Sequence, residues 1–310
     1  MEKSPPETQI RILKYLLLQD LIRFSCVSKY FLQLIRDHYW NFSIRLPQMY
    51  NTHTVRHILS TYRFQDYCLP FRDDVDQILE NCKLIPDTTT LNLVKCELTG
   101  KDLSVFTNLS SLNLNYYRGL ESDGIVKLCC DRMDPFIKID LVETHINDQV
   151  LEAIARVGCE KLALDNNSMI TDLGVQKIVS SGKIRNLSLR GCWRLTDMAF
   201  IGLTEIQSLN IRGCRQITDA TLKYLGDCRK INVMGCCITG INLAELRNCD
   251  HLTIDYHINK ERIINLLGYG KIKTLCVYHK FVLYCIKDEI ETEYNRPLTE
   301  MFPDVKIIHT

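Results

Sequence analysis

Residues 186–192 read Asn-Leu-Ser-Leu-Arg-Gly-Cys, and nearly the same words return at 208–214 (Ser-Leu-Asn-Ile-Arg-Gly-Cys) and at 230–236 (Lys-Ile-Asn-Val-Met-Gly-Cys). Each copy leads to an apolar residue and a threonine, ending at Thr196, Thr218 and Thr239. A pattern that returns at a fixed period of about 20 to 50 residues indicates an architecture of stacked repeats. This stretch therefore decides the fold class.

The pattern extends in both directions along the chain. Its first apolar residue serves as a marker, and the markers are Leu91, Leu112, Ile139, Leu162, Leu187, Leu209, Ile231, Leu252 and Leu275. Successive markers lie 21 to 27 residues apart, a length typical of leucine-rich repeats. A cysteine follows the marker by five residues at Cys96, Cys192, Cys214 and Cys236. Residues 88–280 thus resemble about nine leucine-rich repeats of the cysteine-containing class.

The repeat also has a purely physical explanation. Leu187 and Leu189 are two residues apart, so both point from one face of a short strand into the core. Thr196 or Asp197 offers a side-chain oxygen to the N–H groups that open the next helix. Apolar residues three apart then turn the inner stripe of that helix onto the strands. We expect an α/β solenoid, a horseshoe with parallel strands inside and helices outside.

Composition sets limits on partners and compartment. The chain has 310 residues and a formal net charge of +1, which gives no reason to expect nucleic acid or a membrane as partner. The start of the chain does not resemble a signal peptide, so we expect an intracellular protein, cytoplasmic and/or nuclear and not secreted. The 15 cysteines are odd in number and form no C-x-x-C motif, which favours structural thiols over disulfides or zinc.

Residues 1–46 do not follow the repeat. Three short helices are expected, beginning near Pro5, Asp20 and Ser28, with the third ending near Trp40. The stretch resembles an F-box, the module that docks substrate adaptors on the Skp-type linker subunit of cullin ubiquitin ligases. The matching residues are Pro5, Pro6, Glu7, Ile12, Tyr15, Leu16, Asp20, Leu21, Val27, Ser28, Lys29, Phe31 and Trp40. The resemblance implies docking on the linker subunit through Pro5, Ile12, Leu16, Leu21, Val27 and Trp40.

The remaining segments are interpreted as caps, because terminal repeats must cover their exposed core. Residues 47–87 are expected to form a helical connector, with helices over 53–62 and 74–82. Residues 281–310 are expected to form a C-terminal cap, with a helix over 281–294 and a closing strand over 304–308.

No motif indicates catalysis. His53 and His57 have the i, i+4 spacing of two metal ligands on a helix, but no third ligand is evident, so ordinary packing or surface histidines are favoured. Adjacent cysteines at 129–130 and 236–237 are interpreted as core and turn residues. The glycines form no nucleotide-binding pattern. We expect no enzyme activity, no metal and no cofactor.

The concave face of the repeats is the candidate binding surface. On each strand, the residue between the two core-facing apolar residues and the residue after the second one point to this face. Arginine and aromatic residues are frequent binding hot spots. The candidate substrate-binding residues are Tyr116, Asp165, Arg190, Trp193, Arg212, Met234 and Asp255. Two alternatives stay open: the inner asparagines satisfy only backbone or water, and the Arg190 and Arg212 pair is ordinary surface.

The combined resemblance implies a non-catalytic substrate-recognition subunit of a Skp–cullin–F-box ubiquitin ligase, with a protein substrate on the concave face. The family usually has leucine before the first proline and an apolar residue after the glutamate, where Ser4 and Thr8 stand here. These two departures support an alternative, a leucine-rich-repeat scaffold or inhibitor that does not engage a ubiquitin ligase.

Overall fold

The computed structural model describes residues 5–13, 20–21, 23, 26, 28–37, 40–45, 64–68, 89–92, 103, 106, 108–117, 122–130, 132–255, 258–278 and 303–309. The chain divides into two compact units, residues 1–132 (the N-terminal unit) and 133–310 (the C-terminal unit). Within the described residues, no helix is both long and apolar enough to cross a bilayer.

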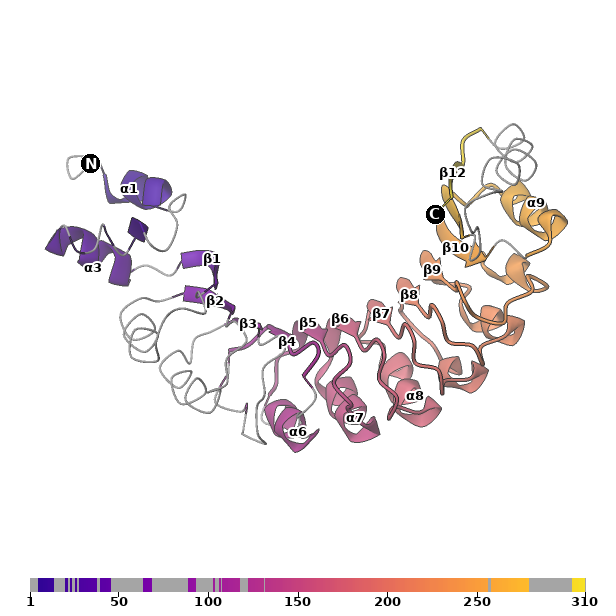
Figure 1. Ribbon diagram of the computed structural model, residues 1–310, viewed down its shortest axis with the longest axis horizontal. Helices are drawn as coiled ribbons and strands as arrows, with labels where there is room; N and C mark the ends of the chain where they lie inside the picture. The colour runs from indigo at the N-terminus through magenta and orange to yellow at the C-terminus, as the bar shows by residue number, and fades with distance from the viewer. Residues whose placement is uncertain are drawn as a thin grey trace, which may run out of the picture. The chain divides into compact units, whose positions relative to one another are not determined.

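The N-terminal unit starts with helices and continues with parallel strands (Figure 1). Its described elements are α1 (Pro6–Leu13), α3 (Lys29–Asp37), β1 (Trp40–Arg45), β2 (Phe64–Cys68), β3 (Thr90–Asn92), β4 (Ser111–Asn113) and α6 (Ser122–Cys130). Helix α1 buries Ile10 and Leu13, and α3 buries Phe31 and Ile35. The four strands pair in parallel in chain order.

The third helix ends at Asp37, close to the expected end near Trp40, and Trp40 itself opens strand β1. One expectation for this unit is wrong. The connector is not wholly helical, because β2 lies inside it and pairs with β3. A parallel sheet that started at β3 would leave that edge strand unpaired, and β1 and β2 extend the ladder instead. The helices expected over 53–62, 74–82 and 281–294 lie outside the described residues.

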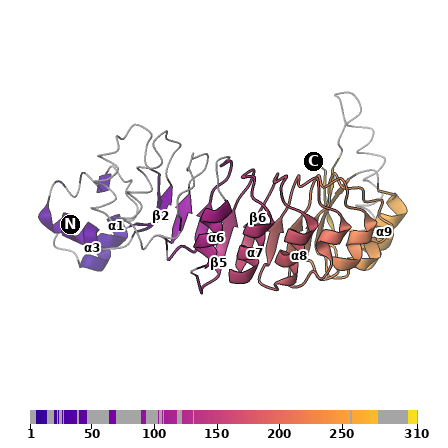
Figure 2. The same ribbon diagram turned by 90° about the horizontal axis from the view of Figure 1, so that it is seen from below.

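The C-terminal unit repeats one strand and one helical segment. Its elements are β5 (Phe136–Asp140), α7 (Asp148–Val157), β6 (Cys159–Ala163), α8 (Asp172–Ser180), β7 (Asn186–Ser188), η2 (Asp197–Phe200), β8 (Ser208–Asn210), η3 (Asp219–Tyr224), β9 (Lys230–Asn232), η4 (Leu243–Glu245), β10 (His251–Asp255), α9 (Lys260–Gly268), β11 (Thr274–Tyr278) and β12 (Lys306–His309). Strands line the inner side of this stack and helical segments the outer side (Figures 1 and 2). Strand β12 confirms the expected closing strand.

The markers set the register of the sheet. In the C-terminal unit each marker pairs with the next in parallel, from Ile139 and Leu162 through Leu252 and Leu275, and the last pairs with Ile307. These markers are at most 3% exposed. Burying such a side chain contributes about 1.5–3 kcal/mol relative to exposure. The marker column is therefore the spine of the core.

The outer segments differ from the expected helices in three repeats. Helices α7, α8 and α9 are α-helical, whereas η2, η3 and η4 are short 3-10 turns. The difference follows the length of the repeat: the α-helical repeats have 23 to 25 residues between markers, and the 3-10 repeats have 21 or 22. A 3-10 turn rises about 2.0 Å per residue against about 1.5 Å for an α-helix, so it crosses the same layer with fewer residues.

The threonine and the aspartate of each Thr-Asp dipeptide have different roles. Thr196 and Thr218 cap their own 3-10 turns, accepting from Met198 N at 3.2 Å and from Ala220 N at 3.2 Å. The aspartates instead accept from the next repeat. Asp172 Oδ1 accepts from Thr196 N at 2.9 Å, and Asp172 Oδ2 accepts from Thr196 Oγ1 at 2.6 Å. The sequence predicted a cap within one repeat and missed this bond between repeats.

The same carboxylate bond recurs at the edge of the C-terminal unit where the strands end. The pairs are Asp148 with Thr171, Asp172 with Thr196, Asp197 with Thr218 and Asp219 with Thr239. We name this series the Thr-Asp ladder. It joins five successive repeats by charge-assisted hydrogen bonds, which are the stronger kind.

The repeat cysteines form a second ladder inside the turn that follows each strand. The thiols of Cys192, Cys214 and Cys236 donate to the carbonyls of Leu164, Leu189 and Ile211, each in the preceding repeat, at 3.1 to 3.3 Å. Before them, Asn167 Nδ2 donates to Leu141 O at 2.7 Å in the same way. A small buried donor is thus what this turn requires, which confirms the structural reading of these cysteines.

Candidate functional site

The inner row of the concave face is small and polar. The asparagines of this row cap their own strand ends: the side-chain oxygens of Asn210 and Asn232 accept from Arg212 N at 3.2 Å and from Met234 N at 3.1 Å. Together with Thr253 and Cys276 of the same row, these asparagines line a groove of about 300 Å³ over strands β8 to β11. The alternative that inner asparagines satisfy the backbone is therefore confirmed at these positions.

The second row separates into structural and exposed residues. Asp165 accepts from Ser188 Oγ at 2.5 Å and from Arg190 N at 3.0 Å. Asp255 is buried and its carboxylate accepts from Gly235 N at 2.6 Å. Gly235 corresponds to Gly213 of the preceding repeat. Gly213 has a left-handed backbone, with φ of 80°, and its N–H donates to a backbone carbonyl, Met234 O, at 2.7 Å. At Gly235, the side-chain carboxylate of Asp255 therefore takes the place of the backbone carbonyl as the acceptor.

These positions correct part of the predicted site. Met234 is 5% exposed and Asp255 is 5% exposed, so neither offers a side chain to a partner. Met234 lies two residues beyond the end of strand β9, where the alternation of a strand no longer applies, whereas Asp255 is the last residue of strand β10 and its carboxylate is engaged by Gly235 N. Asp165 is half-buried and occupied. Arg190 is exposed and Arg212 is half-buried, so burial does not remove this pair from the candidate site.

The two aromatic candidates lie in loops that follow strands. Trp193 is 57% exposed in the loop after β7, in the C-terminal unit. Tyr116 is 46% exposed in the loop after β4, in the N-terminal unit, and has a left-handed backbone with φ of 62°. Both are therefore accessible, each within its own unit.

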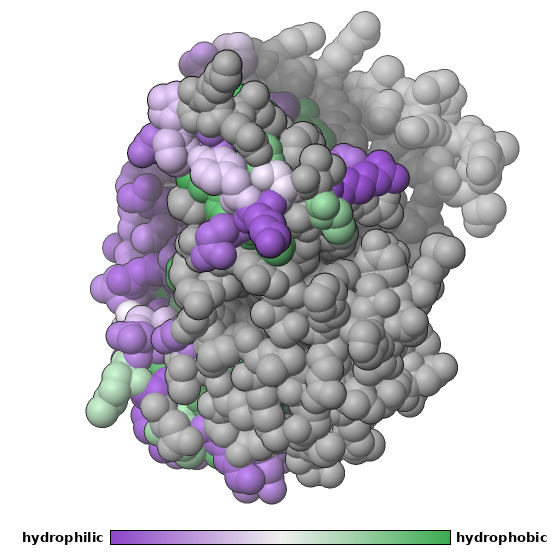
Figure 3. Space-filling view, turned by 90° about the vertical axis from the view of Figure 1, so that its left-hand side faces the viewer, coloured by the Kyte–Doolittle hydropathy of each residue, from purple (hydrophilic) through white to green (hydrophobic). Residues whose placement is uncertain are grey.

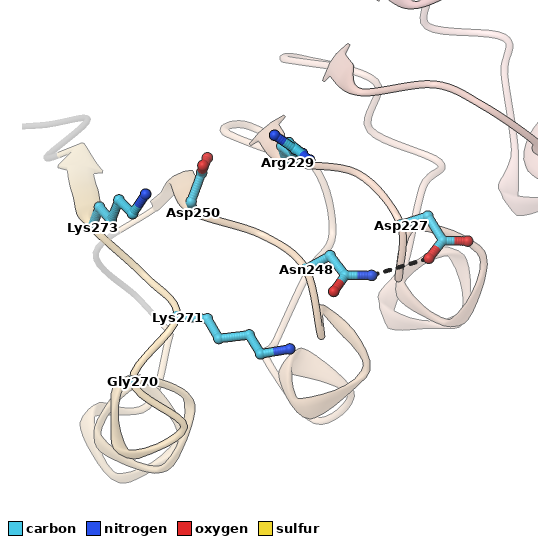
Figure 4. Close-up of a pocket in the computed structure, with 7 residues that line it drawn as sticks. All are labelled: Asp227, Arg229, Asn248, Asp250, Gly270, Lys271 and Lys273. Atoms are coloured by element: carbon cyan, nitrogen blue, oxygen red, sulfur yellow. Dashed lines mark hydrogen bonds between the residues drawn. The ribbon is translucent and has the colours of Figure 1, made fainter.

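A charged pocket lies at the edge of the C-terminal unit where strands β9 to β11 begin (Figure 4). It encloses about 580 Å³ and is lined by Asp227, Arg229, Asn248, Asp250, Gly270, Lys271 and Lys273. Asn248 Nδ2 donates to Asp227 Oδ1 at 3.0 Å. The hydrogen bond with His251 and the positive charges of His251, Lys273 and Arg229 outweigh partial burial and lower the pKa of Asp250.

The sequence reasoning did not single out this pocket. Arg229, Asp250 and Lys273 each stand two residues before a marker, so a recurring charged position was the available signal. Because acidic and basic side chains alternate around the pocket, their charges largely compensate each other. The pocket therefore indicates no single class of ligand.

Five buried thiols of the C-terminal unit are unsuited to nucleophilic chemistry. Burial is the largest effect on Cys192, Cys214, Cys228, Cys236 and Cys249, and it raises the pKa of each to about 12. A thiol reacts as the thiolate, so these groups are inert at neutral pH. Among the described residues, no group of three His, Cys, Asp or Glu side chains is placed to hold a metal ion. His53 and His57 lie outside those residues.

The predicted docking residues have different environments. Pro5 is exposed and Ile12 is 45% exposed on α1, whereas Leu21 is fully buried in the core of the N-terminal unit. Burial corrects the expectation that Leu21 contacts a partner directly. Trp40 opens β1, and Leu16 and Val27 lie outside the described residues. Tyr30, 42% exposed at the start of α3, is an exposed aromatic that the sequence reasoning missed.

At the end of the molecule seen in Figure 3, hydrophilic side chains dominate the described surface, with separate hydrophobic ones among them. Among the described residues of the N-terminal helices, Ile12 and Tyr30 are the large hydrophobic side chains that are exposed, by 45% and 42%. Partner docking through a few hydrophobic anchors with polar surroundings is the usual anatomy of a protein interface.

Comparisons with known proteins agree with this architecture. Residues 5–43 match the model of the F-box domain. The fold is similar to a chain of the crystal structure of the Rad7 and Elc1 complex in yeast, with 15% identity, a TM-score of 0.52, and coverage of 80% of this chain and 78% of that one. It is also similar to a chain of the TLR13–ssRNA13 complex, with 15% identity, a TM-score of 0.57, and coverage of 91% of this chain and 41% of that one.

No curated protein matches the sequence. The F-box match covers a short stretch, and the structural similarities show the fold. Together they confirm the predicted combination of an F-box domain at the N-terminus with a leucine-rich-repeat architecture.

Proposed function

We propose that this protein is a non-catalytic substrate-recognition subunit of a Skp–cullin–F-box type ubiquitin ligase. The observation that carries the proposal is the F-box match at residues 5–43 in a chain whose C-terminal unit is a leucine-rich-repeat stack. The F-box would bind the Skp-type linker subunit, and the C-terminal unit would bind a protein substrate.

In this function the chain contributes proximity rather than chemistry. Holding a substrate next to the ubiquitin-carrying enzyme converts a bimolecular encounter into an effectively unimolecular one. Such a role needs a rigid surface and no reactive group. The inert repeat thiols and the two ladders that tie the repeats together support it.

On the concave face, Arg190 and Arg212 are the predicted residues that keep an accessible position. Each lies two residues after one of the neighbouring strands β7 and β8, which are in direct register, since Ser188 pairs with Asn210. Two guanidinium groups from adjacent repeats would pair with carboxylates of a substrate in bidentate geometry. We therefore place the first substrate contact of the concave face at this pair.

Docking on the linker is tested by titrating the purified full chain against a Skp-type linker subunit by calorimetry. Wild type is expected to bind. Ile12→Asp, which puts a charge at an exposed anchor, is expected to weaken binding by about tenfold or more, as for an interface hot spot. The matched control is Ile137→Asp, because Ile137 is 52% exposed in the C-terminal unit and should leave linker binding unchanged.

Absence of binding by the folded wild type would overturn the proposal. The chain would then be a leucine-rich-repeat scaffold or inhibitor that does not engage a ligase, as the Ser4 and Thr8 departures allow. Equal binding by wild type and Ile12→Asp would instead remove α1 from the docking surface.

A further inference from the structure

The edge of the C-terminal unit at which the strands end carries an unusual set of exposed apolar side chains. We name this edge, formed by the loops between strands β6 to β9 and the helical segments that follow, the trailing edge. Its exposed apolar residues are Met169 (53%), Leu173 (70%), Trp193 (57%), Met198 (55%) and Ile241 (65%). They are five of the nine large hydrophobic residues exposed among the described positions of this unit.

Their alignment follows from hydrogen bonds between repeats. Leu173 and Met198 each come directly after an aspartate of the Thr-Asp ladder, Asp172 and Asp197. Because Asp172 binds Thr196 of the next repeat, these exposed residues stand at equivalent positions of neighbouring repeats. Gln176 Nε2 also donates to Met198 O at 2.7 Å, which fixes the start of η2 against α8.

The loop before the ladder is held in the same way. Arg194 NH1 lies 3.4 Å from Ser168 O, and Gln216 Nε2 donates to Trp193 O at 2.9 Å. Trp193 therefore rests on a loop that is bonded to both neighbouring repeats, yet more than half of its side chain faces solvent. A rigid, exposed tryptophan loses little conformational entropy on binding, which makes it a suitable anchor for a partner.

Charge distinguishes which partner this edge suits. The exposed side chains of Arg190, Arg194 and Arg215 lie in the same loops or directly before them. The aspartates of the edge are occupied: Asp197 accepts from Thr218 N at 2.8 Å, from Thr218 Oγ1 at 2.7 Å, and from the Thr221 hydroxyl. These neutral donors leave the negative charge of the carboxylates in place but occupy their oxygens, so the exposed arginine side chains are the charged groups of this edge that are best placed to pair with a partner.

We propose that the trailing edge is a docking surface for an acidic protein segment that carries apolar anchor side chains. The apolar residues of the segment would cover Trp193 and its apolar neighbours, and its carboxylates would pair with the arginines. Exposed apolar side chains that gather at one edge of a soluble protein among polar residues mark such interaction sites. Only the identification of this segment as part of a ubiquitin ligase substrate rests on the proposed function.

The test uses the full chain and a phage-displayed library of random peptides of about 12 residues, long enough to cross four repeats at about 4.8 Å per strand. Selection is expected to enrich sequences that combine large apolar residues with Asp or Glu. Synthesised winners should bind the triple variant Leu173→Ser, Trp193→Ser, Met198→Ser at least about tenfold more weakly, which corresponds to about 1.4 kcal/mol.

The matched control replaces three exposed apolar residues elsewhere in the same unit, as Met133→Ser, Ile201→Ser, Tyr269→Ser, and should bind like wild type. The charge reversal Arg194→Glu, Arg215→Glu should also weaken binding, and added salt should reduce the wild-type affinity. Comparable thermal unfolding of all variants would exclude misfolding as the cause.

Three results would overturn the proposal: no enrichment, enrichment of basic sequences, or equal binding by the trailing-edge triple variant. None of them bears on linker docking, because the calorimetric titration of the F-box is read separately. Conversely, enriched acidic and apolar peptides with no linker binding would establish the docking surface and refute the ligase role.

Discussion

The Thr-Asp ladder makes the sharpest prediction about stability, at Asp219. Its carboxylate accepts four hydrogen bonds from the next repeat: Thr239 N at 2.9 Å, Thr239 Oγ1 at 2.7 Å, Gly240 N at 2.8 Å and Ile241 N at 3.1 Å. The perturbation is Asp219→Ala, which removes the acceptor of all four. Asp219→Asn is the milder change, because it keeps one oxygen and removes the charge.

The loss of stability depends on which of the four donors can form a hydrogen bond to water once the carboxylate is removed. A hydrogen bond to a charged group contributes about 1.5–3 kcal/mol, and a buried donor left unpaired costs about 1–3 kcal/mol. Thr239 and Ile241 are exposed and their N–H groups regain water, whereas Gly240 is buried. We therefore expect Asp219→Ala to lower the free energy of unfolding by about 2–3 kcal/mol and Asp219→Asn by about 1–2 kcal/mol.

The pH dependence has a defined sign. Burial raises the pKa of Asp219, but the Thr239 hydroxyl and the three backbone N–H groups outweigh it, and the net pKa is lowered. The stabilisation is therefore fully present above the unfolded pKa of about 3.9 and is lost as the pH falls through the lower folded value. The difference in stability between wild type and Asp219→Asn should shrink in that acidic range.

The assay is urea unfolding followed by circular dichroism near pH 7 and near pH 3, with Asp134→Asn as an exposed control expected to stay within about 0.5 kcal/mol of wild type. Hydrogen exchange of the Gly240 amide gives a local readout and should accelerate in both Asp219 variants. Unchanged unfolding in Asp219→Ala, together with unchanged exchange at Gly240, would refute the role of the ladder.

Three other outcomes are expected. A thiol reagent near neutral pH should modify Cys237, which is exposed, and spare Cys192 and Cys214 until the chain unfolds. The reason is that burial raises the pKa of both buried thiols to about 12. Mass spectrometry checks this by counting the labelled sites. Leu209→Ala, at a 1% exposed marker, should cost about 2–5 kcal/mol of stability in urea unfolding, whereas Met133→Ala, at a 96% exposed site, should be neutral. Cys214→Ser should unfold at lower urea concentration than wild type, since serine is more costly to bury, and equal midpoints would contradict a structural thiol.

Much of the fold could be predicted from the sequence, because the repeat supplies independent copies of the same signal. The markers in the C-terminal unit all lie in strands with the expected pairing, and the turn cysteines are buried. The outer layer could not be predicted as well, because whether a segment forms an α-helix or a 3-10 turn depends on the residues available to cross it. Repeat length, which separates α8 from η2, held that information.

The candidate site was predicted less well for a related reason. Alternation along a strand stops applying after its last residue, and Met234, two residues beyond β9, is buried. Asp255, the last residue of β10, is buried because its carboxylate binds a backbone N–H of the preceding repeat. Contacts between repeats, such as those of Asp165 with Ser188 and Arg190, depend on three-dimensional register that one repeat does not contain. Exposed anchors such as Leu173 were missed because they stand directly after the Thr-Asp dipeptide, outside the apolar core positions of the repeat and outside the strand residues that predicted the concave face.

The central claim is that the N-terminal F-box joins this chain to a ubiquitin ligase. The most direct measurement is the molar mass, by light scattering after size-exclusion chromatography, of the full chain mixed with a Skp-type linker subunit and the cullin that it binds. We expect one complex that contains a single copy of each protein, and we expect Ile12→Asp to abolish it. Elution of the folded wild-type chain at its own mass of 36.0 kDa, apart from a linker–cullin complex, would contradict the claim.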